Sequence, residues 1–169
     1  MEHPKAVGDR STLAIMLALR EVGFDLYVPF GENTRCDLVI DDGGRLIRVQ
    51  CKTGRLREGA VRFATCSSYA HHPNPRNRNR SYQGEVDYFA GYCRQTGGVY
   101  LVPIEDVPLR RMGALRVDAA RNNQRRGIRL AAQYEVARLA ANISRRPYGQ
   151  VCESGSVSSE RPSAHSVER

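Results

Sequence analysis

The sequence has no hydrophobic segment long enough to cross a membrane. The longest uninterrupted apolar run, Leu13–Leu19, is far shorter than the roughly 18 residues that span a bilayer. The first residues, Met1–Arg10, are polar and charged and do not resemble a signal peptide. We therefore expect a cytoplasmic protein that has no membrane partner.

Paired cysteine motifs are also missing. The five cysteines include no CxxC spacing, and their odd number argues against a framework of disulfides. A zinc site that uses His71 or His72 lacks the paired cysteine spacings typical of such sites. We therefore interpret Cys36, Cys51 and Cys66 as small apolar residues of strands.

Acidic residues are scarce relative to basic ones. The chain has 26 Lys and Arg but 18 Asp and Glu, which gives a formal net charge of +8 and a pI of about 9.6. Such a balance favours a polyanionic partner, either nucleic acid or an anionic membrane surface. Because the sequence contains no basic amphipathic helix of the kind that binds membranes, nucleic acid is favoured.

The 169 residues, 41% of them hydrophobic and 26% charged, fit one ordinary folded domain. Helices are expected at Ser11–Val22, whose apolar residues cover most of its circumference and which Gly23 ends, and at Gly127–Ile143. The expected strands are Phe24–Pro29, Cys36–Ile40, Arg45–Lys52, Ala60–Cys66, Asp87–Cys93 and Val99–Pro103. Residues 1–148 would form the domain, and residues 149–169, rich in Ser, Glu and Arg, a disordered tail.

The sharpest group of polar residues lies on a predicted hairpin. Asp37 begins one strand, and Asp41-Asp42-Gly43-Gly44 forms a tight turn. Gln50 and Lys52 share one face near the end of the next strand. Because the two strands are antiparallel, a turn at this position brings Asp37 close to the level of Gln50.

These residues can hold a hard cation. The Asp37 carboxylate, the Gln50 amide oxygen and the Cys51 backbone carbonyl are oxygen ligands of the kind that Mg²⁺ prefers. The Lys52 ammonium can orient an attacking water or stabilise charge on a phosphate. The alternative is an exposed sheet face that carries a solvated Asp, Gln and Lys.

Basic residues are concentrated between Arg45 and Arg80. This segment has nine Lys and Arg against one acid, Glu58, so its net charge of +8 equals that of the whole chain. It includes the strand of Lys52 and most of a predicted loop, Ser67–Gln83, rich in Arg, Asn and Pro. Such a placement favours contacts with nucleic-acid phosphates around a scissile bond, with an ordinary polar loop as the alternative.

Several stretches of the chain resemble the PD-(D/E)XK nuclease superfamily. The resemblance rests on Pro29–Val39 and Arg48–Gly54 and extends through Gly84–Phe89, Val99–Pro103 and Asn122–Gln124. Within the superfamily, the chain most resembles the group I intron-encoded homing endonucleases of this fold and their free-standing bacterial relatives, which also have Gln where most members have Glu. The resemblance implies an α/β (α+β), restriction-endonuclease-like core, with a central mixed sheet flanked by helices and the first helix beside the active site.

By this resemblance, Asp37 is the metal-binding acid, Gln50 the second ligand and Lys52 the catalytic lysine. The implied reaction is hydrolysis of a DNA phosphodiester with Mg²⁺, or with Mn²⁺ in its place. Cutting both strands of a duplex usually needs two active sites, so a homodimer or larger assembly is expected. Two alternatives stay open: a DNA-binding module that keeps the fold without cleavage, and a nuclease of the Holliday-junction resolvase type.

The chain departs from the family pattern at three places. Cys36 replaces the proline that often precedes the metal-binding acid, and Gln50 supplies one negative charge fewer than a glutamate. Many relatives carry a glutamate on the first helix, and its place falls near Thr12, which has no charge. Glu32, in the turn before Asp37, is the candidate for a substitute metal-binding carboxylate, with a turn or capping role as its alternative.

Ten basic or amide residues are expected to contact DNA. They lie on the hairpin, in the loop that follows it and in the segment before the last expected helix, where only the family resemblance supports the contact. The residues are Arg35, Arg48, Arg55, Arg57, Arg76, Arg78, Arg80, Asn122, Asn123 and Gln124.

Overall fold

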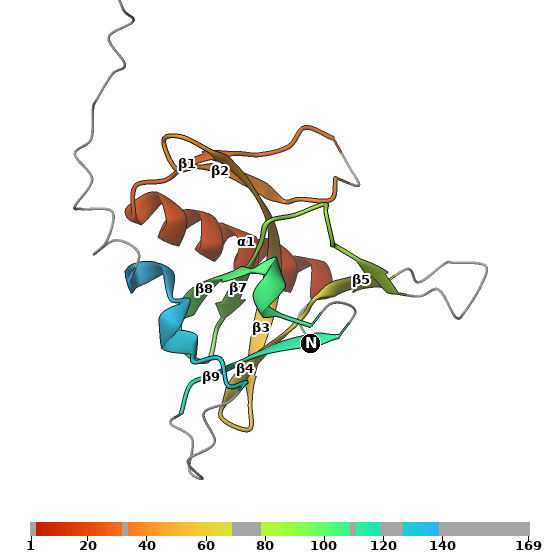
Figure 1. Ribbon diagram of the computed structural model, residues 1–169, viewed down its shortest axis with the longest axis vertical. Helices are drawn as coiled ribbons and strands as arrows, with labels where there is room; N and C mark the ends of the chain where they lie inside the picture. Colours follow the sequence, from red (N-terminus) through yellow and green to blue (C-terminus); the bar gives the residue numbers. More distant parts are fainter. Residues whose placement is uncertain (1–2, 32–33, 69–78, 109–110, 119–126, 139–169) are drawn as a thin grey trace, which may run out of the picture.

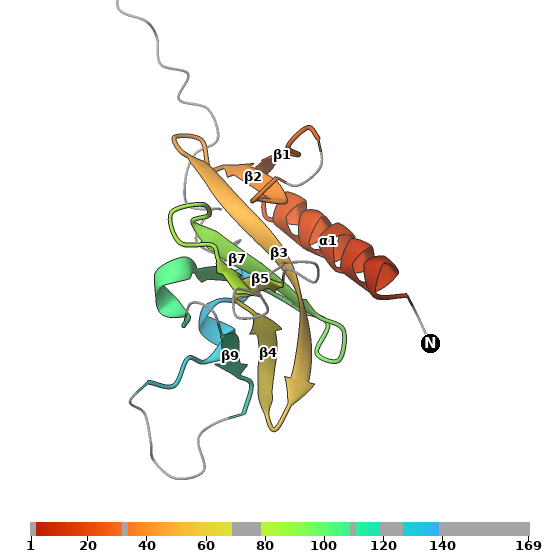
Figure 2. The ribbon, with the colours of Figure 1, turned by 90° about the vertical axis from the view of Figure 1, so that its right-hand side faces the viewer.

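A mixed β-sheet with a long helix on one face forms the fold (Figures 1 and 2). The computed structural model describes residues 3–31, 34–68, 79–108, 111–118 and 127–138. Helix α1 runs over Pro4–Glu21 and packs against the central strands. This α+β arrangement, a mixed sheet with helices packed on it, is the architecture that the family resemblance implies.

Helix α1 begins earlier than expected. Pro4 stands in the first turn, where the N–H that proline lacks has no partner within a helix, and the His3 side chain accepts a hydrogen bond from the Lys5 N–H at 3.3 Å. The expected start at Ser11 was therefore wrong, and Ser11 is a buried residue in the middle of the helix. Gly23, with a φ of +93°, follows the helix end as expected.

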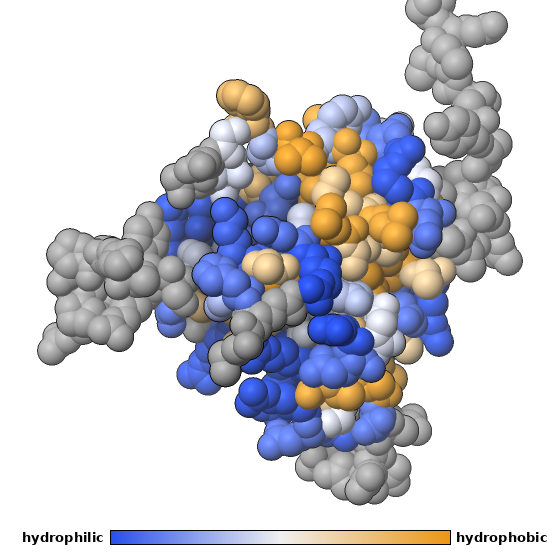
Figure 3. Space-filling model, turned by 180° about the vertical axis from the view of Figure 1, so that it is seen from behind, coloured by the Kyte–Doolittle hydropathy of each residue, from blue (hydrophilic) through white to orange (hydrophobic). Residues whose placement is uncertain are grey.

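Only one stripe of α1 faces the sheet. Ser11, Ile15 and Leu19 repeat every four residues and are buried, whereas Leu13 and Leu17 are 67% and 62% exposed. The expected burial around most of the helix circumference was therefore wrong. Figure 3, which shows the molecule from the side of α1, has apolar residues gathered among hydrophilic ones.

The sheet has seven strands arranged around β3 (Leu46–Arg57). The other six are β1 (Asp25–Tyr27), β2 (Leu38–Asp41), β4 (Ala60–Ala64), β7 (Tyr88–Cys93), β8 (Gly98–Pro103) and β9 (Met112–Arg116). β7 runs parallel to β3, and the other pairs are antiparallel. β5 (Cys66–Ser68) and β6 (Asn79–Ser81) form a separate two-stranded sheet within the predicted loop.

Two strands share one edge of β3. β2 pairs with its first half as far as Leu38↔Val49, and β4 pairs with its last residues, beginning at Arg55↔Arg62. β7 pairs with the opposite edge over Val49–Gly54. The shared edge therefore has a gap between β2 and β4, at Gln50–Gly54, where no strand among the described residues pairs with this edge of β3.

β3 is longer than expected, because it continues past Lys52 to Arg57 before it turns into β4. The turn consists of Glu58 and Gly59, whose φ angles are +51° and +69°. Two residues with positive φ make the type of turn whose twist matches that of a hairpin. The hairpin of β3 and β4 thus extends the sheet beyond the gap.

Hydrophobic clusters lie on both faces of the sheet. The cluster on the α1 face includes Ile15, Leu19, Ile47 and Val49. The cluster on the other face includes Phe63, Phe89, Tyr100, Val102 and Leu115, and it reaches the 3₁₀ helices η2 (Ile104–Asp106) and η3 (Ala131–Gln133) through Ile104 and Ala131. Since successive side chains of a strand alternate between faces, the even-numbered residues Gln50 and Lys52 lie on the face opposite α1.

The expected helix Gly127–Ile143 is wrong in its first half. Leu130 forms a bridge with Arg116 of β9, and Glu135 forms one with Tyr100 of β8. Because the backbone of this segment pairs with two strands, it cannot make the hydrogen bonds of a continuous helix. Within this segment, α-helical residues begin at Val136, and the part of the expected helix after Arg138 lies outside the described residues, as does the expected tail.

Strand β9 was not expected from the sequence, and it pairs with β4 along the whole of that strand. The short helix η2 follows directly on β8. Among the described helices, none is long and apolar enough to span a membrane.

Candidate active site

Asp37 fills the gap in the sheet. Its backbone N–H donates to the Val49 carbonyl at 2.9 Å, which continues the β2–β3 ladder by one residue. Its carboxylate then accepts hydrogen bonds from the Cys51 N–H at 2.8 Å and from the Gln50 amide. The hairpin thus brings Asp37 level with Gln50, as the sequence predicts.

The surroundings of Asp37 disfavour its negative charge. Burial raises the pKa of this carboxyl above the ordinary value of 3.8, although the Cys51 N–H, the charge of Lys52 and the Gln50 amide act in the opposite direction. A cation beside the carboxylate would favour the ionised form. The site therefore has an acid whose charge lacks full compensation within the described protein.

The oxygen atoms around Asp37 fit a hard divalent cation. The Gln50 side chain is 8% exposed and touches the Asp37 carboxylate through its amide, and rotation of that amide exchanges its oxygen and nitrogen. The N–H and C=O of a strand residue point toward the same neighbour, so the Cys51 carbonyl lies on the edge that carries Asp37. These atoms are the ligand types that Mg²⁺ prefers, but they include a single carboxylate.

The Cys51 thiol is not part of this oxygen set. Cys51 belongs to the cluster on the α1 face, and its side chain has a hydrogen bond with Thr12. Burial, followed by the charge of Asp37, raises the pKa of the thiol to about 12, so it remains protonated at neutral pH. Among the described residues, no group of three or more His, Cys, Asp or Glu could hold a metal ion.

Lys52 is held by a tyrosine that the sequence did not single out as its partner. The Lys52 Nζ donates to the Tyr82 hydroxyl at 3.0 Å and lies 4.6 Å from the centre of its ring. Tyr82 is buried and packs edge-on against Phe89 at 5.6 Å. Since these contacts fix the ring, Tyr82 limits the positions that the Lys52 ammonium can take.

Arg35 joins the β5–β6 hairpin to the site. Its guanidinium lies 4.2 Å from the centre of the Tyr82 ring and donates to Glu85 at 2.6 Å. It also donates to the Ser67 hydroxyl at 3.0 Å and to the Ser81 carbonyl at 2.8 Å. These contacts engage Arg35 inside the protein, so its expected role in DNA contact stays a prediction.

Glu85 binds two of the arginines expected to contact DNA, Arg35 and Arg80. Burial raises the pKa of its carboxyl, but the hydrogen bonds and charges of the two arginines outweigh burial and hold the pKa below its ordinary value.

Arg48 is paired with Asp87, whose carboxylate accepts hydrogen bonds from the Arg48 backbone N–H at 2.8 Å and from the Arg48 guanidinium at 3.1 Å. The Arg48 hydrogen bond is the main cause that lowers the pKa of Asp87. Asp87 thus anchors the edge of strand β3 at Arg48.

Comparison with known proteins identifies the fold family. A model of the PD-(D/E)XK endonuclease family matches residues 2–137. The chain belongs to this PD-(D/E)XK endonuclease family. No curated protein matches the chain at a significant level.

Two solved structures are similar to this PD-(D/E)XK chain. The bacterial homing endonuclease I-Ssp6803I has 20% identity and a TM-score of 0.61, and the match covers 83% of this chain and 93% of that one. A Holliday junction resolvase, Hjc from the archaeal hyperthermophile Archaeoglobus fulgidus, has 14% identity and a TM-score of 0.44, with 79% and 95% covered. The first of these supports the fold alone.

In this PD-(D/E)XK chain, the place expected for the helix glutamate of many relatives, near Thr12, carries hydroxyl groups. The Ser11 hydroxyl of α1 forms a hydrogen bond of 2.8 Å with the Thr53 hydroxyl on β3, next to Lys52. Thr12 contacts Cys51, so the middle of the helix approaches the gap without bringing a carboxylate to it. Glu21 is the last residue of α1, and Glu32 lies outside the described residues.

The remaining candidates for DNA contact divide into two groups. Arg55 and Arg57 lie exposed on the part of β3 beyond the gap. The others lie outside the described residues, namely Arg76, Arg78, Asn122, Asn123 and Gln124. His71 and His72 lie outside them too.

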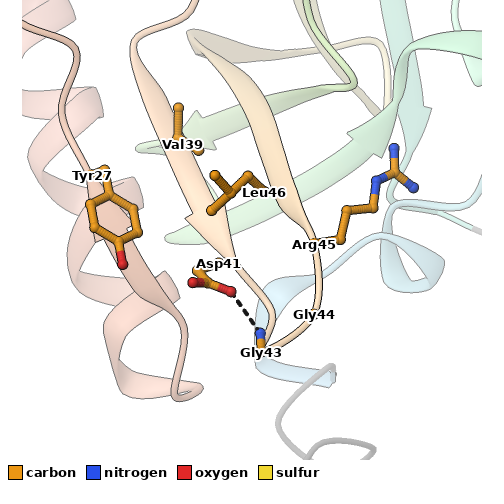
Figure 4. A pocket seen from close by; sticks show the side chains of 7 residues that line it. All are labelled: Tyr27, Val39, Asp41, Gly43, Gly44, Arg45 and Leu46. Atoms are coloured by element: carbon orange, nitrogen blue, oxygen red, sulfur yellow. Dashed lines mark hydrogen bonds between the residues drawn. The ribbon is translucent and has the colours of Figure 1, made fainter. Parts of the chain in front are cut away.

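A hollow at the opposite end of the β2–β3 hairpin is not part of the site (Figure 4). Tyr27, Val39 and Leu46 give it an apolar lining, and Asp41 accepts a hydrogen bond there from the Gly43 N–H at 2.8 Å. None of the residues that line it is a predicted site residue. The chemistry-bearing groups therefore gather at the gap and not at this turn.

Proposed function

We propose that this chain is an endonuclease that hydrolyses DNA phosphodiester bonds with Mg²⁺ or Mn²⁺. The observation that supports the proposal is the meeting of Asp37, Gln50 and Lys52 at the gap in the sheet. Asp37, the Gln50 amide oxygen and the Cys51 carbonyl would hold the metal ion. Membership of the PD-(D/E)XK endonuclease family supports the same reaction.

A bound metal ion supplies an activated water and offsets negative charge that develops on the phosphate. The protein itself contributes the position and the positive charge of a side chain beside the phosphate. Lys52 presents its ammonium next to the metal ligands, where it stabilises the phosphate oxygens or orients the attacking water. Tyr82 holds that ammonium through its hydroxyl and its ring.

Metal binding by this site is expected to be weak. Gln50 provides an oxygen atom without a charge, and the described residues offer Asp37 as the one carboxylate at the gap. Glu32, the candidate for a further carboxylate, precedes Asp37 by five residues. We also propose a cytoplasmic location and, if both strands are cut, a homodimer or larger assembly.

Cleavage assays test this proposal. The purified protein is incubated with plasmid, linear and branched DNA, with Mg²⁺, Mn²⁺ or EDTA, beside Asp37→Asn, Lys52→Ala and the control Asp41→Asn. We expect cleavage that needs a metal ion and that falls about a hundredfold or more in the first two variants, because each removes a charge that acts on the reacting phosphate or its metal ion. Asp41, on the same strand at the turn end of the hairpin, should be dispensable. Cleavage that survives both Asp37→Asn and Lys52→Ala would refute the assignment.

The alternative function is a DNA-binding module that has lost cleavage. The presence of a single carboxylate among the described groups at the gap, with the Gln50 amide donating to it, favours this alternative. DNA binding without cleavage under any metal ion would support it. A strong preference for branched over linear DNA would instead favour a nuclease of the Holliday-junction resolvase type.

A further inference from the structure

A second group of basic residues surrounds a hollow beyond the active site. The hollow lies between the first turns of α1, the end of β3 and the turn that joins β7 to β8. The residues that line it include Val7, Thr53, Gly54, Arg55, Arg57 and Arg94. We name it the basic hollow, because three of these residues are arginines and none of the described residues that line it is acidic.

The three arginines of the basic hollow differ from those of the active site. Arg55, Arg57 and Arg94 are exposed, and in the described part of the chain they form no ion pair with an acid. The arginines near the site do have acidic partners: Glu85 binds Arg35 and Arg80, and Asp87 binds Arg48. Neighbouring arginines without acids repel one another, and an anion between them removes that repulsion.

The first turn of α1 adds to the positive charge of the basic hollow. This turn contains Lys5 and no acidic residue, and the nearby Val7 lines the hollow. The N-terminal end of a long helix carries a partial positive charge from its unpaired N–H groups. α1 is 18 residues long, so its N-terminal end adds to the field of the three arginines.

The basic hollow follows the active site along β3, and the side chains of its odd-numbered β3 residues lie on the α1 face, opposite the face of Lys52. Thr53 and Gly54 follow Lys52 in the strand and line the hollow. At about 3.3 Å per strand residue, Arg55 and Arg57 lie roughly 10 and 17 Å from Lys52 along the strand. A duplex rises about 3.4 Å per base pair, so this span corresponds to roughly three to five base pairs. Figure 2 shows β3, the N-terminal end of α1 and the turn between β7 and β8 together on one side of the molecule.

From these observations we propose that the basic hollow binds backbone phosphates of the DNA duplex that flanks the scissile phosphate. The proposal rests on the proposed function, since it needs DNA at Lys52, and it adds Arg94 and the N-terminal end of α1 to the interface. The groove walls of a duplex carry phosphates of both strands, so the hollow can take either strand. Contacts to phosphates fix the position of a duplex without reading its sequence.

The salt dependence of DNA binding tests this inference. Binding of a duplex of about 20 base pairs is measured in Ca²⁺ or EDTA, without cleavage, for the full chain and for Arg55→Gln, Arg57→Gln and Arg94→Gln, singly and combined. Each lost phosphate contact should reduce the slope of log K against log salt by about 0.9, so the triple variant should lose between two and three units of slope. Arg20→Gln, at the far end of α1, is the matched control because it removes the same charge and should leave the slope unchanged.

The outcomes separate this inference from the proposed function. If the variants bind and cleave DNA with the slope of the wild-type protein, the basic hollow is not a phosphate site, while the proposed function stands. If the wild-type protein binds no duplex at all, the proposed function fails. The single variants keep the test decisive if the triple variant does not fold, because all three side chains are exposed and each replacement is small.

Discussion

At the scale of single residues, the environment of Asp37 explains how the site can attract a cation. The gap in the sheet removes one strand partner, and the carboxylate of Asp37 takes its place by accepting from the Cys51 N–H. The same position buries the carboxyl and raises its pKa. A protein that holds an acid in this way sacrifices some stability for the ability to bind a positive charge.

We predict that Asp37→Asn stabilises the metal-free protein at neutral pH. Because the pKa of Asp37 is raised on folding, its contribution to stability is present below the unfolded value of 3.8 and is lost as the pH rises through the folded value. The variant has no carboxyl at this position and does not lose this stability as the pH rises. The difference in melting temperature, variant minus wild-type protein, should therefore be larger near pH 7 than near pH 4. Asp41→Asn is the control. An advantage that does not change with pH would contradict the assigned effect of burial.

At the scale of elements, β3 organises both the fold and the site. Its first half pairs with β2, its end with β4 and its other edge with β7, so one strand carries Gln50, Lys52 and two of the three arginines of the basic hollow. Gly54 lies where β3 passes from the gap to β4. A Cβ atom at Gly54 would lie 2.8 Å from a methyl group of Val61 and 3.3 Å from the Tyr92 carbonyl oxygen.

We predict that Gly54→Ala destabilises the protein by about 1–3 kcal/mol, the usual effect of forcing an extra group into a packed core. Gly44→Ala is the matched control, because a Cβ atom there meets no other atom within 4 Å. Denaturant unfolding of the two variants and the wild-type protein measures the difference. Equal stability of Gly54→Ala and the wild-type protein would mean that β3 and β4 approach less closely at this point.

The elements that the sequence predicts well are those whose signals are local. Alternation of apolar and polar residues identified β3, and the Asp-Gly turn fixed the register that brings Asp37 to Gln50. The segment after Gly127 was predicted wrongly because its backbone partners are strands β8 and β9. No local sequence pattern predicts such pairing, and the spacing of apolar residues in this segment also fits a helix.

At the scale of the whole molecule, positive charge is arranged in two ways. Around the site, arginines form ion pairs with acids that are distant in the sequence. Glu85, for example, pairs with Arg35, which lies 50 residues earlier in the chain. In the sequence, such arginines look available for contact with DNA, because the acid that pairs with them can lie as far away in the chain as Glu85 lies from Arg35. In the basic hollow, the described arginines keep their charge without such partners, which makes this surface the better candidate for a DNA backbone.

The sequence predicts the part of the candidate site that lies on the β2–β3 hairpin. Asp37, Gln50 and Lys52 lie on two adjacent strands, and their register follows from the turn. Tyr82 was not assigned to Lys52 because 30 residues separate the two in the chain, and they meet only in the folded protein. Such contacts depend on the tertiary fold and not on spacing in the chain.

The most direct test of a metal site at the gap is calorimetric titration of Mg²⁺ and Mn²⁺ into the wild-type protein, Asp37→Asn, Gln50→Glu and the control Asp41→Asn. We predict that Asp37→Asn weakens binding about tenfold or more and that Gln50→Glu strengthens it, because the first removes and the second adds a negative ligand charge. Asp41→Asn should bind like the wild-type protein. Unchanged affinity in Asp37→Asn, or weaker binding by Gln50→Glu, would contradict a metal site built on these two residues.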